Sequence, residues 1–589
     1  MPSKKNTAGW QWAVLVAASF SISTSIAADD LSQQQMLEMM ERRFKQMEEK
    51  LEATQSKLQA TQAEQQATKT KLEAAETRLQ ATESRLAEFD AGKRVKNGQG
   101  FAGNTAEKKP VPVAAPATTV QAGESGFKIT SPSGDYQLRF NALVQADQDI
   151  FFNTKGVTIN TGISAVPNND RNNDDRLWMR RVRPIFSGTL FKYTDFYLQP
   201  DFGQGQMRLF DAYADIHYFD WLGFTAGKQR SLLGGLENLK SSATLFSMEQ
   251  GYSSMMAPNR EIGLTFHGEF SAPGQTHKYT NHISFNDWFT YQIGLFSGTA
   301  DNTNPGLNPV TATNFSTETS TAGNKGVEAR VFAHPFQGSG IEPLEGFGVG
   351  IAGGYDNPNN QTTLPAMVSV GQNPIFTYVA AVGANGTRTR IHPQAYWFWG
   401  PFGALGDWTQ TTQTLSSYLQ PSAAGTVTQS ATQNNQAGQI QLSYNLTGEK
   451  NGFGVLKPEK SFDPMSEGGW GALQVVGRWS GLYMDNSVFN TSATSGGQTS
   501  YAFADPRVSV QQANTWSIGL NWFLNANVKI TTEYDQTNFV GGCSTGAMSA
   551  QYNPGCLTGT TASGASAATG QVINRPDEKI IMQRFQLAF

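Results

Sequence analysis

From Phe127 to the end of the chain, short segments of alternating apolar and polar residues recur. In one of them, Trp516, Ile518 and Leu520 alternate with Ser517 and Gly519. Successive side chains of a β-strand point to opposite faces, so this pattern predicts strands with one apolar and one polar face. Tight turns separate some strands, and long stretches rich in Asn, Thr, Ser and Gly separate others: 152–175, 298–325, 356–387, 418–436, 481–512 and 538–577. Short turns at one end and long polar loops at the other are typical of a transmembrane β-barrel.

The number of strands and the composition agree with this interpretation. We expect about 16 antiparallel strands in residues 127–589, and an even number closes such a barrel. Charged residues make up only 16% of the 589-residue chain, Gly occurs 59 times, and 11% of the residues are aromatic. No apolar run after the N-terminus approaches the 20 or so residues that a membrane-spanning helix needs. The chain ends on Phe589, an aromatic terminus that is common in outer-membrane barrels. We therefore predict an all-β transmembrane barrel over 127–589.

The first residues form a separate region. Lys4 and Lys5 precede an apolar run over residues 10–20, and Ser25-Ile-Ala27 ends the segment. A basic start, a short apolar core and a small-x-small site predict a secretory signal peptide over 1–27, with a membrane anchor as the alternative. We expect the mature chain to work outside the cytoplasm.

Residues 28–90 carry a seven-residue repeat. The first core position is occupied by Leu37, Phe44, Leu51, Leu58, Gln65, Leu72, Leu79 and Leu86, and the second by Met40, Met47, Thr54, Thr61, Thr68, Ala75, Thr82 and Phe89. A sustained heptad predicts an α-helical coiled coil, with an isolated amphipathic helix as the alternative. Small Thr and Ala residues weaken this core, so another element must hold the oligomer together. Residues 91–126 are rich in Pro, Ala and Gly and predict a linker.

One predicted strand, residues 176–190, is unusually basic. Its apolar face holds Trp178, Val182, Pro184, Phe186 and Leu190, and its polar face holds Arg181, Arg183, Ser187 and Thr189. Guanidinium groups keep their charge and suit oxyanions, so a pore lined by this polar face would attract anions. Strict alternation places Arg180 on the apolar face, so it must lie near a membrane interface, in a subunit contact or at a bulge.

Other chemistry is not indicated by the sequence. Cys543 and Cys556, the only two cysteines, lie in the last long loop and predict a local disulfide. The six His residues show no metal-binding spacing, and no catalytic or phosphate-loop motif occurs. A net charge of -4 does not suggest nucleic-acid binding. We expect a protein that is not an enzyme and has neither cofactor nor metal.

Several segments together resemble the phosphate-selective porins O and P. They are 180–184 (RRVRP), 210–213 (FDAY), 235–237 (GLE), 241–242 (SS), 393–403 (PQAYWFWGPFG), 444–449 (YNLTGE), 462–464 (FDP), 468–472 (GGWGA), 519–522 (GLNW) and 584–589 (RFQLAF). The resemblance implies a homotrimer of 16-stranded barrels in the outer membrane, each with its own pore. It also implies an inward-folded third loop and an anion site in which an arginine–lysine cluster lies beside an aspartate.

The family's site residues are matched with departures. Arg180 and Arg181 match the arginine pair, and Asp211 matches the aspartate that orients it. The inward loop would run from about Lys228 to Arg260, with Glu237 and Glu249 at matching places. Asn238 and Gln250 stand where basic residues are usual. Leu143 replaces a family arginine, and we expect Arg139, four residues back on the same face, to substitute for it. The expected anion pathway consists of Arg139, Arg180, Arg181, Arg183, Asp211, Lys228, Lys240 and Arg260.

Three functional hypotheses follow. The first is a Gram-negative outer-membrane porin, with its coiled coil in the periplasm, that passes small anions such as phosphate or polyphosphate by passive diffusion. The second is a broad-specificity porin that has lost the phosphate site. The third is a structural envelope tether that reaches peptidoglycan through the coiled coil. Besides small anions and other copies of the chain, the expected partner is outer-membrane lipid, and no nucleic acid is expected.

Overall fold

A computed structural model describes residues 118–152, 175–205, 207–272, 287–298, 325–359, 361, 364, 366–379, 382–418, 427–465, 468–495, 498–544 and 572–589. The predicted signal peptide, the predicted coiled coil, most of the linker and Cys556 lie outside the described residues. In the part of the chain that the structure describes, the helices are too short or too polar to cross a membrane.

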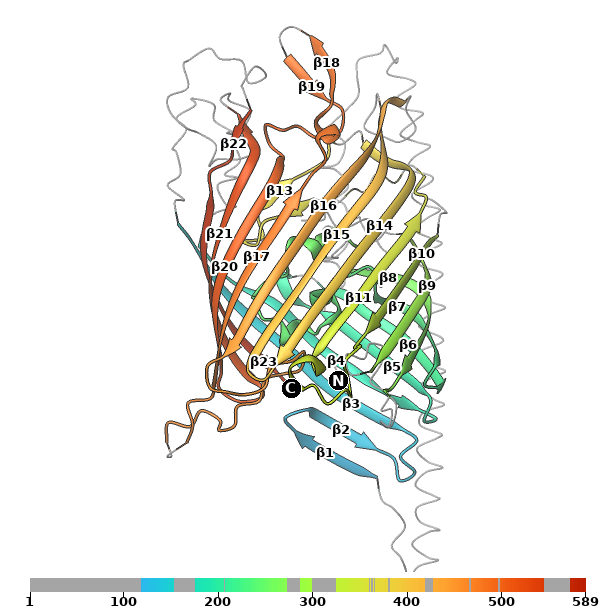
Figure 1. Cartoon of the computed structure of the whole chain (residues 1–589), viewed down its shortest axis with the longest axis vertical. Helices are drawn as coiled ribbons and strands as arrows, with labels where there is room; N and C mark the ends of the chain where they lie inside the picture. The colour runs from blue at the N-terminus through green and yellow to red at the C-terminus, as the bar shows by residue number, and fades with distance from the viewer. Residues whose placement is uncertain are drawn as a thin grey trace, which may run out of the picture. The chain divides into compact units, whose positions relative to one another are not determined.

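Sixteen of the described strands form one closed antiparallel barrel (Figure 1). Each pairs with the next along the chain, and the last pairs with the first, as in the match of Met582 with Asp149. In order they are β3 (Gln137–Phe152), β4 (Arg176–Leu190), β5 (Thr194–Asp201), β6 (Arg208–Phe219), β7 (Leu222–Arg230), β8 (Arg260–Phe270), β9 (Phe289–Phe296), β10 (Gly326–Ala333), β11 (Phe347–Asp356), β14 (Val382–Trp399), β15 (Phe402–Tyr418), β16 (Val427–Asn445), β17 (Ala472–Tyr483), β20 (Val510–Phe523), β21 (Val528–Ser544) and β23 (Glu578–Ala588). The predicted barrel of about 16 strands is confirmed.

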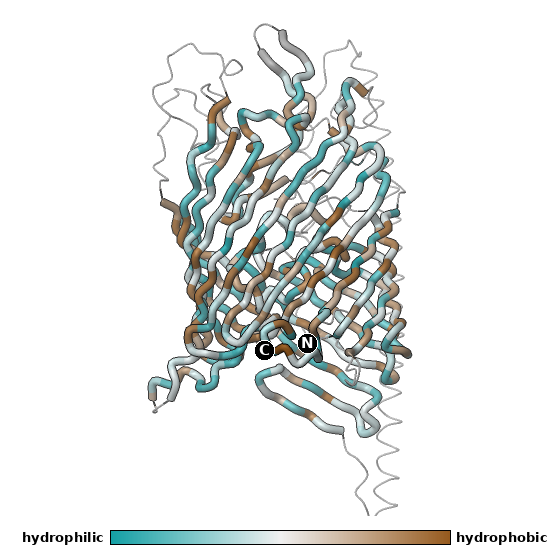
Figure 2. The backbone as a smooth tube through the Cα atoms, viewed as in Figure 1, coloured by the Kyte–Doolittle hydropathy of each residue, from teal (hydrophilic) through white to brown (hydrophobic). Residues whose placement is uncertain are grey.

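The two faces of the strands differ as the alternation predicts. On β20, Ile518 and Leu520 are exposed on the outer face, whereas Thr515, Ser517 and Asn521 are buried on the inner face. The alternating bands along the strands are visible in Figure 2. Tight turns join β14 to β15 and β20 to β21, where the sequence predicted them. The outer face can therefore meet lipid while the inner face surrounds a polar interior.

A small hairpin extends the sheet near the start of β3. It consists of β1 (Thr119–Gly123) and β2 (Gly126–Thr130), so part of the segment predicted as linker is a strand. β2 pairs with the first residues of β3, and β23 pairs with the rest of that strand. The ring of the last residue, Phe589, contacts Phe127 and Phe140 at centroid distances of 6.0 and 6.1 Å. The two ends of the barrel chain are thus packed together.

A β-bulge in β4 changes which of its side chains face inward. Gln145 of β3 pairs with Arg181 and the next residue, Ala146, pairs with Met179, so Arg180 is the extra residue. The bulge is one of the three explanations given for Arg180, and it turns the strand by one residue. The prediction that Trp178 lies on the apolar outer face is therefore wrong: its Nε1 donates a hydrogen bond to Asp149 at 3.1 Å, a lumen-side carboxylate.

Residues 231–259, between β7 and β8, fold into the barrel and are called the inward loop below. The loop contains α3 (Leu236–Leu239), η3 (Ser242–Thr244) and η4 (Tyr252–Met255), and nearly all of its side chains are buried. Its predicted bounds, about 228–260, agree with the structure.

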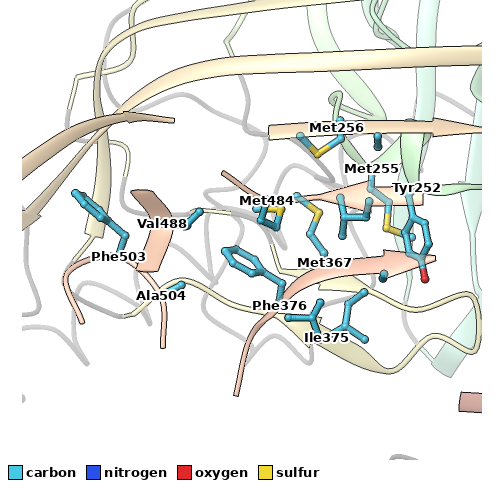
Figure 3. Packing of buried hydrophobic residues seen from close by; sticks show 14 of the residues in the cluster. Tyr252, Met255, Met256, Met367, Ile375, Phe376, Met484, Val488, Phe503 and Ala504 are labelled. Carbon is cyan, nitrogen blue, oxygen red and sulfur yellow. The ribbon is translucent and has the colours of Figure 1, made fainter. Parts of the chain in front are cut away.

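Two further segments also turn inward, which the sequence did not predict. One, called the second inward segment below, holds β12 (Met367–Val368) and β13 (Pro374–Phe376). The other consists of η6 (Asn486–Phe489) and residues 502–504, on either side of a hairpin of β18 (Thr491–Ser495) and β19 (Gln498–Tyr501) that projects beyond the end of the barrel (Figure 1). Figure 3 shows their apolar side chains packed with those of the inward loop: Tyr252, Met255, Met256, Met367, Ile375, Phe376, Met484, Val488, Phe503 and Ala504. This cluster rests on inward-facing residues of the wall such as Leu415 and Ala513. These segments, predicted to be polar outer loops, therefore help to fill the lumen. The short strand β22 (Val572–Asn574) pairs with the end of β21.

Candidate functional site in the barrel lumen

The inward loop is bound to strands far from its own ends. The backbone N–H of Leu236 donates to Asp407 of β15 at 3.3 Å. The side-chain amide of Asn521, on β20, donates to the carbonyl of Phe246 at 2.8 Å. The amide of Gln586, on β23, donates to the carbonyl of Ala243 at 3.0 Å. Contacts with three separate strands hold the loop across the lumen, where it narrows any path through the barrel.

Three arginines converge on one carboxylate of this loop, Glu249. Arg180 binds it with two parallel hydrogen bonds, Nε to Oε1 at 2.8 Å and Nη2 to Oε2 at 2.7 Å. Arg584 of β23 approaches Oε1 at 2.6 Å, and Arg181 approaches Oε2 at 3.3 Å. All four side chains are at most 5% exposed. The bulge in β4 makes this possible, because it lets two consecutive arginines face inward.

Arg183 and two further carboxylates complete what we call the arginine cluster: Arg180, Arg181, Arg183 and Arg584 with Glu249, Asp147 and Asp201. Arg584 binds Asp147 through Nε at 2.7 Å and Nη2 at 2.6 Å. Arg183 binds Asp201 at 2.7 Å. Four guanidinium groups thus face three carboxylates, which leaves an excess of one positive charge in the cluster.

The pKa of Glu249, which lies in the loop and not on a strand, reflects these neighbours. Burial by itself raises this pKa, but the guanidinium groups of Arg180, Arg181 and Arg584 together hold it well below its usual range. The carboxyl group therefore stays ionised at any physiological pH.

A second group of charges, the acidic cluster, lies where α3 of the inward loop meets β17 and β21: Glu237 of α3, with Glu533 and Asp535 of β21, around Arg478 of β17. The guanidinium group of Arg478 is 3.8 Å from Glu237 and 3.7 Å from both Glu533 and Asp535. Glu533 also accepts hydrogen bonds from Ser247 Oγ at 2.8 Å and from the backbone N–H of Met248 at 3.2 Å. Three carboxylates here share one guanidinium group, the reverse of the balance in the arginine cluster.

The tip of the second inward segment lies over the arginine cluster. Arg176 donates to the carbonyl of Gly371, and Arg180 Nη2 donates to the side chain of Gln372 at 3.3 Å. Asn373 donates to Glu578 of β23 at 2.6 Å. The arginine cluster therefore lies between two segments that enter the lumen: the inward loop, which connects β7 to β8, and the second inward segment, which connects β11 to β14.

A cavity of about 130 Å³ lies between the inward loop and the connection that follows β16. Its lining is partly apolar, with Phe246 and Phe523, and also includes Lys450 and Lys529. No group of three or more His, Cys, Asp or Glu side chains in the described ranges is arranged to hold a metal ion.

Residues 152–538 match the sequence model of the family described as phosphate-selective porin O and P. This chain belongs to the phosphate-selective porin O and P family. The porin is accordingly a non-enzymatic channel, and its β-barrel is of the bacterial outer-membrane type.

Solved outer-membrane proteins are similar to the porin at low sequence identity. OmpT of Vibrio cholerae, folded in vitro, is 9% identical with a TM-score of 0.40, and the match covers 77% of this chain and 98% of OmpT. The outer-membrane channel DcaP of Acinetobacter baumannii is 10% identical with a TM-score of 0.39, covering 78% and 99%. OprB of Pseudomonas putida is 9% identical with a TM-score of 0.37, covering 77% and 94%. A search of curated protein sequences gave no match.

The structure of the porin places the predicted site residues in several groups. Arg180, Arg181 and Arg183 are together in the arginine cluster. The carboxylate of Asp211, which the resemblance predicts to orient the arginine pair, binds Arg260 at 2.6 Å from Nε. Asn238, in place of a family basic residue, accepts a hydrogen bond from Arg260 at 3.0 Å.

The other three basic residues of the predicted anion pathway are not among the groups that bind Glu249. Arg139 is exposed near the start of β3, in register with Ser187 of β4. Lys228 is buried on β7, in register with Ile262 of β8. Lys240 follows α3, and its ammonium group lies 3.7 Å from the ring centroid of Phe246. Burial lowers the pKa of this loop lysine to about 7.

Sequence reasoning missed Arg584, Asp147 and, of the acidic cluster, Arg478, Glu533 and Asp535. Arg584 was noted only as part of the closing strand, although it lies on the inner face that the alternation assigns to it. Cys543 is buried at the end of β21, and because Cys556 lies outside the described residues, the disulfide stays a prediction.

Proposed function

We propose that this porin passes small anions, phosphate among them, by passive diffusion past the arginine cluster. The observation that carries the proposal is the convergence of Arg180, Arg181 and Arg584 inside the lumen, beside the inward loop. Guanidinium groups offer several donors in a fixed plane, and these can replace part of the hydration that an anion loses in a narrow channel. Membership of the phosphate-selective family supports the same substrate class.

The charge balance supports a local preference for anions. The arginine cluster has four guanidinium groups and three carboxylates, and Arg260 adds a further guanidinium paired with Asp211. An anion that enters this region would meet excess donors, whereas a cation would meet carboxylates already bound by arginine. Coulomb interactions are strong in a confined space of low dielectric constant, so an excess of one charge is enough to bias passage.

A broad-specificity porin is the second candidate. It is favoured by the carboxylate partners of these arginines and by Asn238 and Gln250 at usually basic positions. In such a porin the cluster would order the loops and bias the charge of solutes without binding phosphate tightly.

Channel recordings in planar bilayers test the proposal. Under a KCl gradient, the reversal potential should show that chloride is more permeant than potassium. A preference for potassium would contradict anion passage, and absence of any conductance would favour the envelope tether. Phosphate titrated into chloride then separates the first two candidates, because a phosphate site gives block at low phosphate concentration and a broad-specificity pore does not.

We further propose that the porin is a homotrimer in the outer membrane of a Gram-negative bacterium, with its coiled coil in the periplasm. The heptad over 31–89 supports an oligomer. Because Thr and Ala at its second core position make the coiled coil weak, contacts between the barrels must also hold the oligomer together. Deleting residues 31–89 while keeping the signal peptide should leave conductance intact. If this deletion also detaches the outer membrane from the rest of the cell envelope, the coiled coil has a mechanical role, such as contact with peptidoglycan.

A further inference from the structure

We propose that Glu249 is a built-in competitor for the anion site, a tethered carboxylate in the position where the arginines would otherwise hold an anion from solution. The inference deepens the proposed function and rests on it, because it assumes that solutes reach the arginine cluster. It assigns a specificity-determining role to a residue of the inward loop.

The geometry around Glu249 is that of a bound oxyanion. Arg180 donates two parallel hydrogen bonds to it, from Nε to Oε1 at 2.8 Å and from Nη2 to Oε2 at 2.7 Å. Guanidinium groups bind carboxylate and phosphate alike in this bidentate arrangement. Arg584 and Arg181 approach the same two oxygens at 2.6 and 3.3 Å. Three guanidinium groups around one carboxylate exceed what a structural ion pair needs, whereas a divalent phosphate would balance more of their charge.

The backbone around Glu249 is held by contacts of its own, so the Glu249 side chain can move without the loop. The backbone carbonyl of Glu249 accepts a hydrogen bond from Arg478, and the N–H of Met248 donates to Glu533 at 3.2 Å. These contacts with the acidic cluster hold the loop independently of the Glu249 carboxylate. Rotation of the Glu249 side chain would therefore open the site without unfolding the loop.

The arginines of the cluster also donate hydrogen bonds to groups other than Glu249. Arg181 Nη1 donates to the neutral amide of Gln145 at 2.7 Å, a contact that an incoming anion could replace. Arg584 keeps its second carboxylate, Asp147, when Glu249 leaves. The open site would then hold Arg180 and Arg181 with their charges uncompensated by Glu249, and these are the groups that phosphate would bind.

Competition of this kind weakens the apparent affinity for external anions. The apparent dissociation constant equals the intrinsic one divided by the fraction of molecules in which the site is open. If the Glu249 carboxylate occupies the site in nine molecules of ten or more, its removal should strengthen phosphate binding about tenfold or more. A purely structural Glu249 predicts no such gain.

The test compares Glu249→Gln with wild type in bilayers of stated ionic strength, with inorganic phosphate titrated against chloride. The half-blocking phosphate concentration should fall at least about tenfold in E249Q. Glu237→Gln is the matched control, since Glu237 is an equally buried carboxylate of the same loop that faces the acidic cluster. In E237Q the half-blocking concentration should stay within about twofold of wild type.

A second readout does not depend on conductance. At constant ionic strength, added phosphate should raise the melting temperature of E249Q at concentrations about tenfold lower than those that wild type needs, because stabilisation by a ligand follows its affinity for the folded state. If E249Q does not assemble, Glu249→Asp keeps the charge but shortens the side chain, and its half-blocking concentration should lie below that of wild type.

The outcomes separate this inference from the proposed function. An anion-preferring wild type with an unchanged half-blocking concentration in E249Q, or in E249D if E249Q does not assemble, overturns the inference and leaves the function standing. A wild type and variants that all prefer cations overturn the proposed function as well. A tenfold gain in E249Q together with a similar gain in E237Q would also overturn the inference, because general loss of negative charge would then explain both.

Discussion

The two carboxylates of the inward loop lie in opposite environments only twelve positions apart. Glu249 is surrounded by three guanidinium groups in the arginine cluster. Glu237, in the acidic cluster, has one guanidinium group at 3.8 Å and is otherwise held by neutral donors, the N–H of Gly251 at 2.7 Å and the amide of Gln439 at 2.9 Å. Burial raises the pKa of Glu237, whereas that of Glu249 is held well below its usual range despite burial.

The comparison shows that the lumen is not uniformly basic. The acidic cluster places Glu237, Glu533 and Asp535 around one arginine, and the arginine cluster places four arginines around three carboxylates. Both clusters bind the inward loop. The arginines of the arginine cluster bind the carboxylate of Glu249, whereas Glu533 and Arg478 of the acidic cluster bind mainly the backbone of the loop. Selectivity in this porin would then be set locally by which cluster a solute passes, and not by the net charge of the lining.

The largest expected effect comes from breaking the arginine cluster at Arg584. Arg584→Gln leaves Asp147 and Glu249 without their shared partner on the strand that closes the barrel. Removing one member of a buried ion pair typically costs about 3–5 kcal/mol. Urea unfolding in lipid, followed by tryptophan fluorescence, should show a loss of this size.

Lys579→Gln is the control for Arg584, because it removes a positive charge from the same strand at a partly exposed position. It should change the free energy of unfolding by less than about 0.5 kcal/mol. Equal losses in the two variants would show that the arginine cluster contributes no special stability, and the contrast between the clusters would not stand.

The barrel could be predicted from the sequence because its signal is repeated in every strand. Alternation fixes which residues face inward, and Arg584 and Glu533 obey it. The bulge in β4 was one of three explanations for Arg180, and the sequence could not choose among them because the bulge depends on the pairing of Gln145 and Ala146 with a neighbouring strand. Two consecutive arginines on a membrane strand were the only local sign of it, and the position of Trp178 was wrong for that reason.

The carboxylate partners of the arginines were harder to foresee. Glu249 is 68 or more positions from each of the arginines that it binds, and only the path of the inward loop brings them together. The second inward segment did carry a signal: an apolar run that includes Met367, Val368, Ile375 and Phe376 interrupts a loop otherwise rich in Asn and Gln. Such a run is too apolar for an outer loop and indicates burial.

A smaller effect is expected from the acidic cluster. Glu533→Gln keeps an acceptor for Ser247 and Met248 but removes one negative charge near Arg478. A unit charge about 10 Å from a water-filled path contributes about 0.4 kcal/mol, which corresponds to about a twofold change. The chloride-to-potassium permeability ratio should therefore rise about twofold in reversal-potential measurements.

The direction of this change matters more than its size. A lower ratio in E533Q would mean that solutes do not sense the acidic cluster as negative. The local contrast between the clusters would then not extend to the conduction path. Gln474→Glu, which adds a carboxylate to β17, is the converse variant and should lower the ratio.

The smallest expected effect is a pH dependence that comes from Lys240. Burial lowers the pKa of this lysine to about 7, while Glu237 opposes the shift and Lys529 adds to it. Lys240 is therefore charged below about pH 7 and largely neutral above it, so the loop loses a positive charge as the pH rises. The permeability ratio of chloride to potassium should fall between pH 6 and pH 8, by less than about twofold for one charge screened by water.

Lys240→Met identifies the source of that change. Its side chain can still contact the rings of Phe246 and Phe453, which lie 3.7 and 4.8 Å from the ammonium group, but it cannot titrate. The permeability ratio of K240M should be nearly constant from pH 6 to pH 8, at the value that wild type reaches at pH 8. A pH dependence of the same size in K240M would show that it comes from other titratable groups, and the charge of Lys240 would then have no effect on permeation.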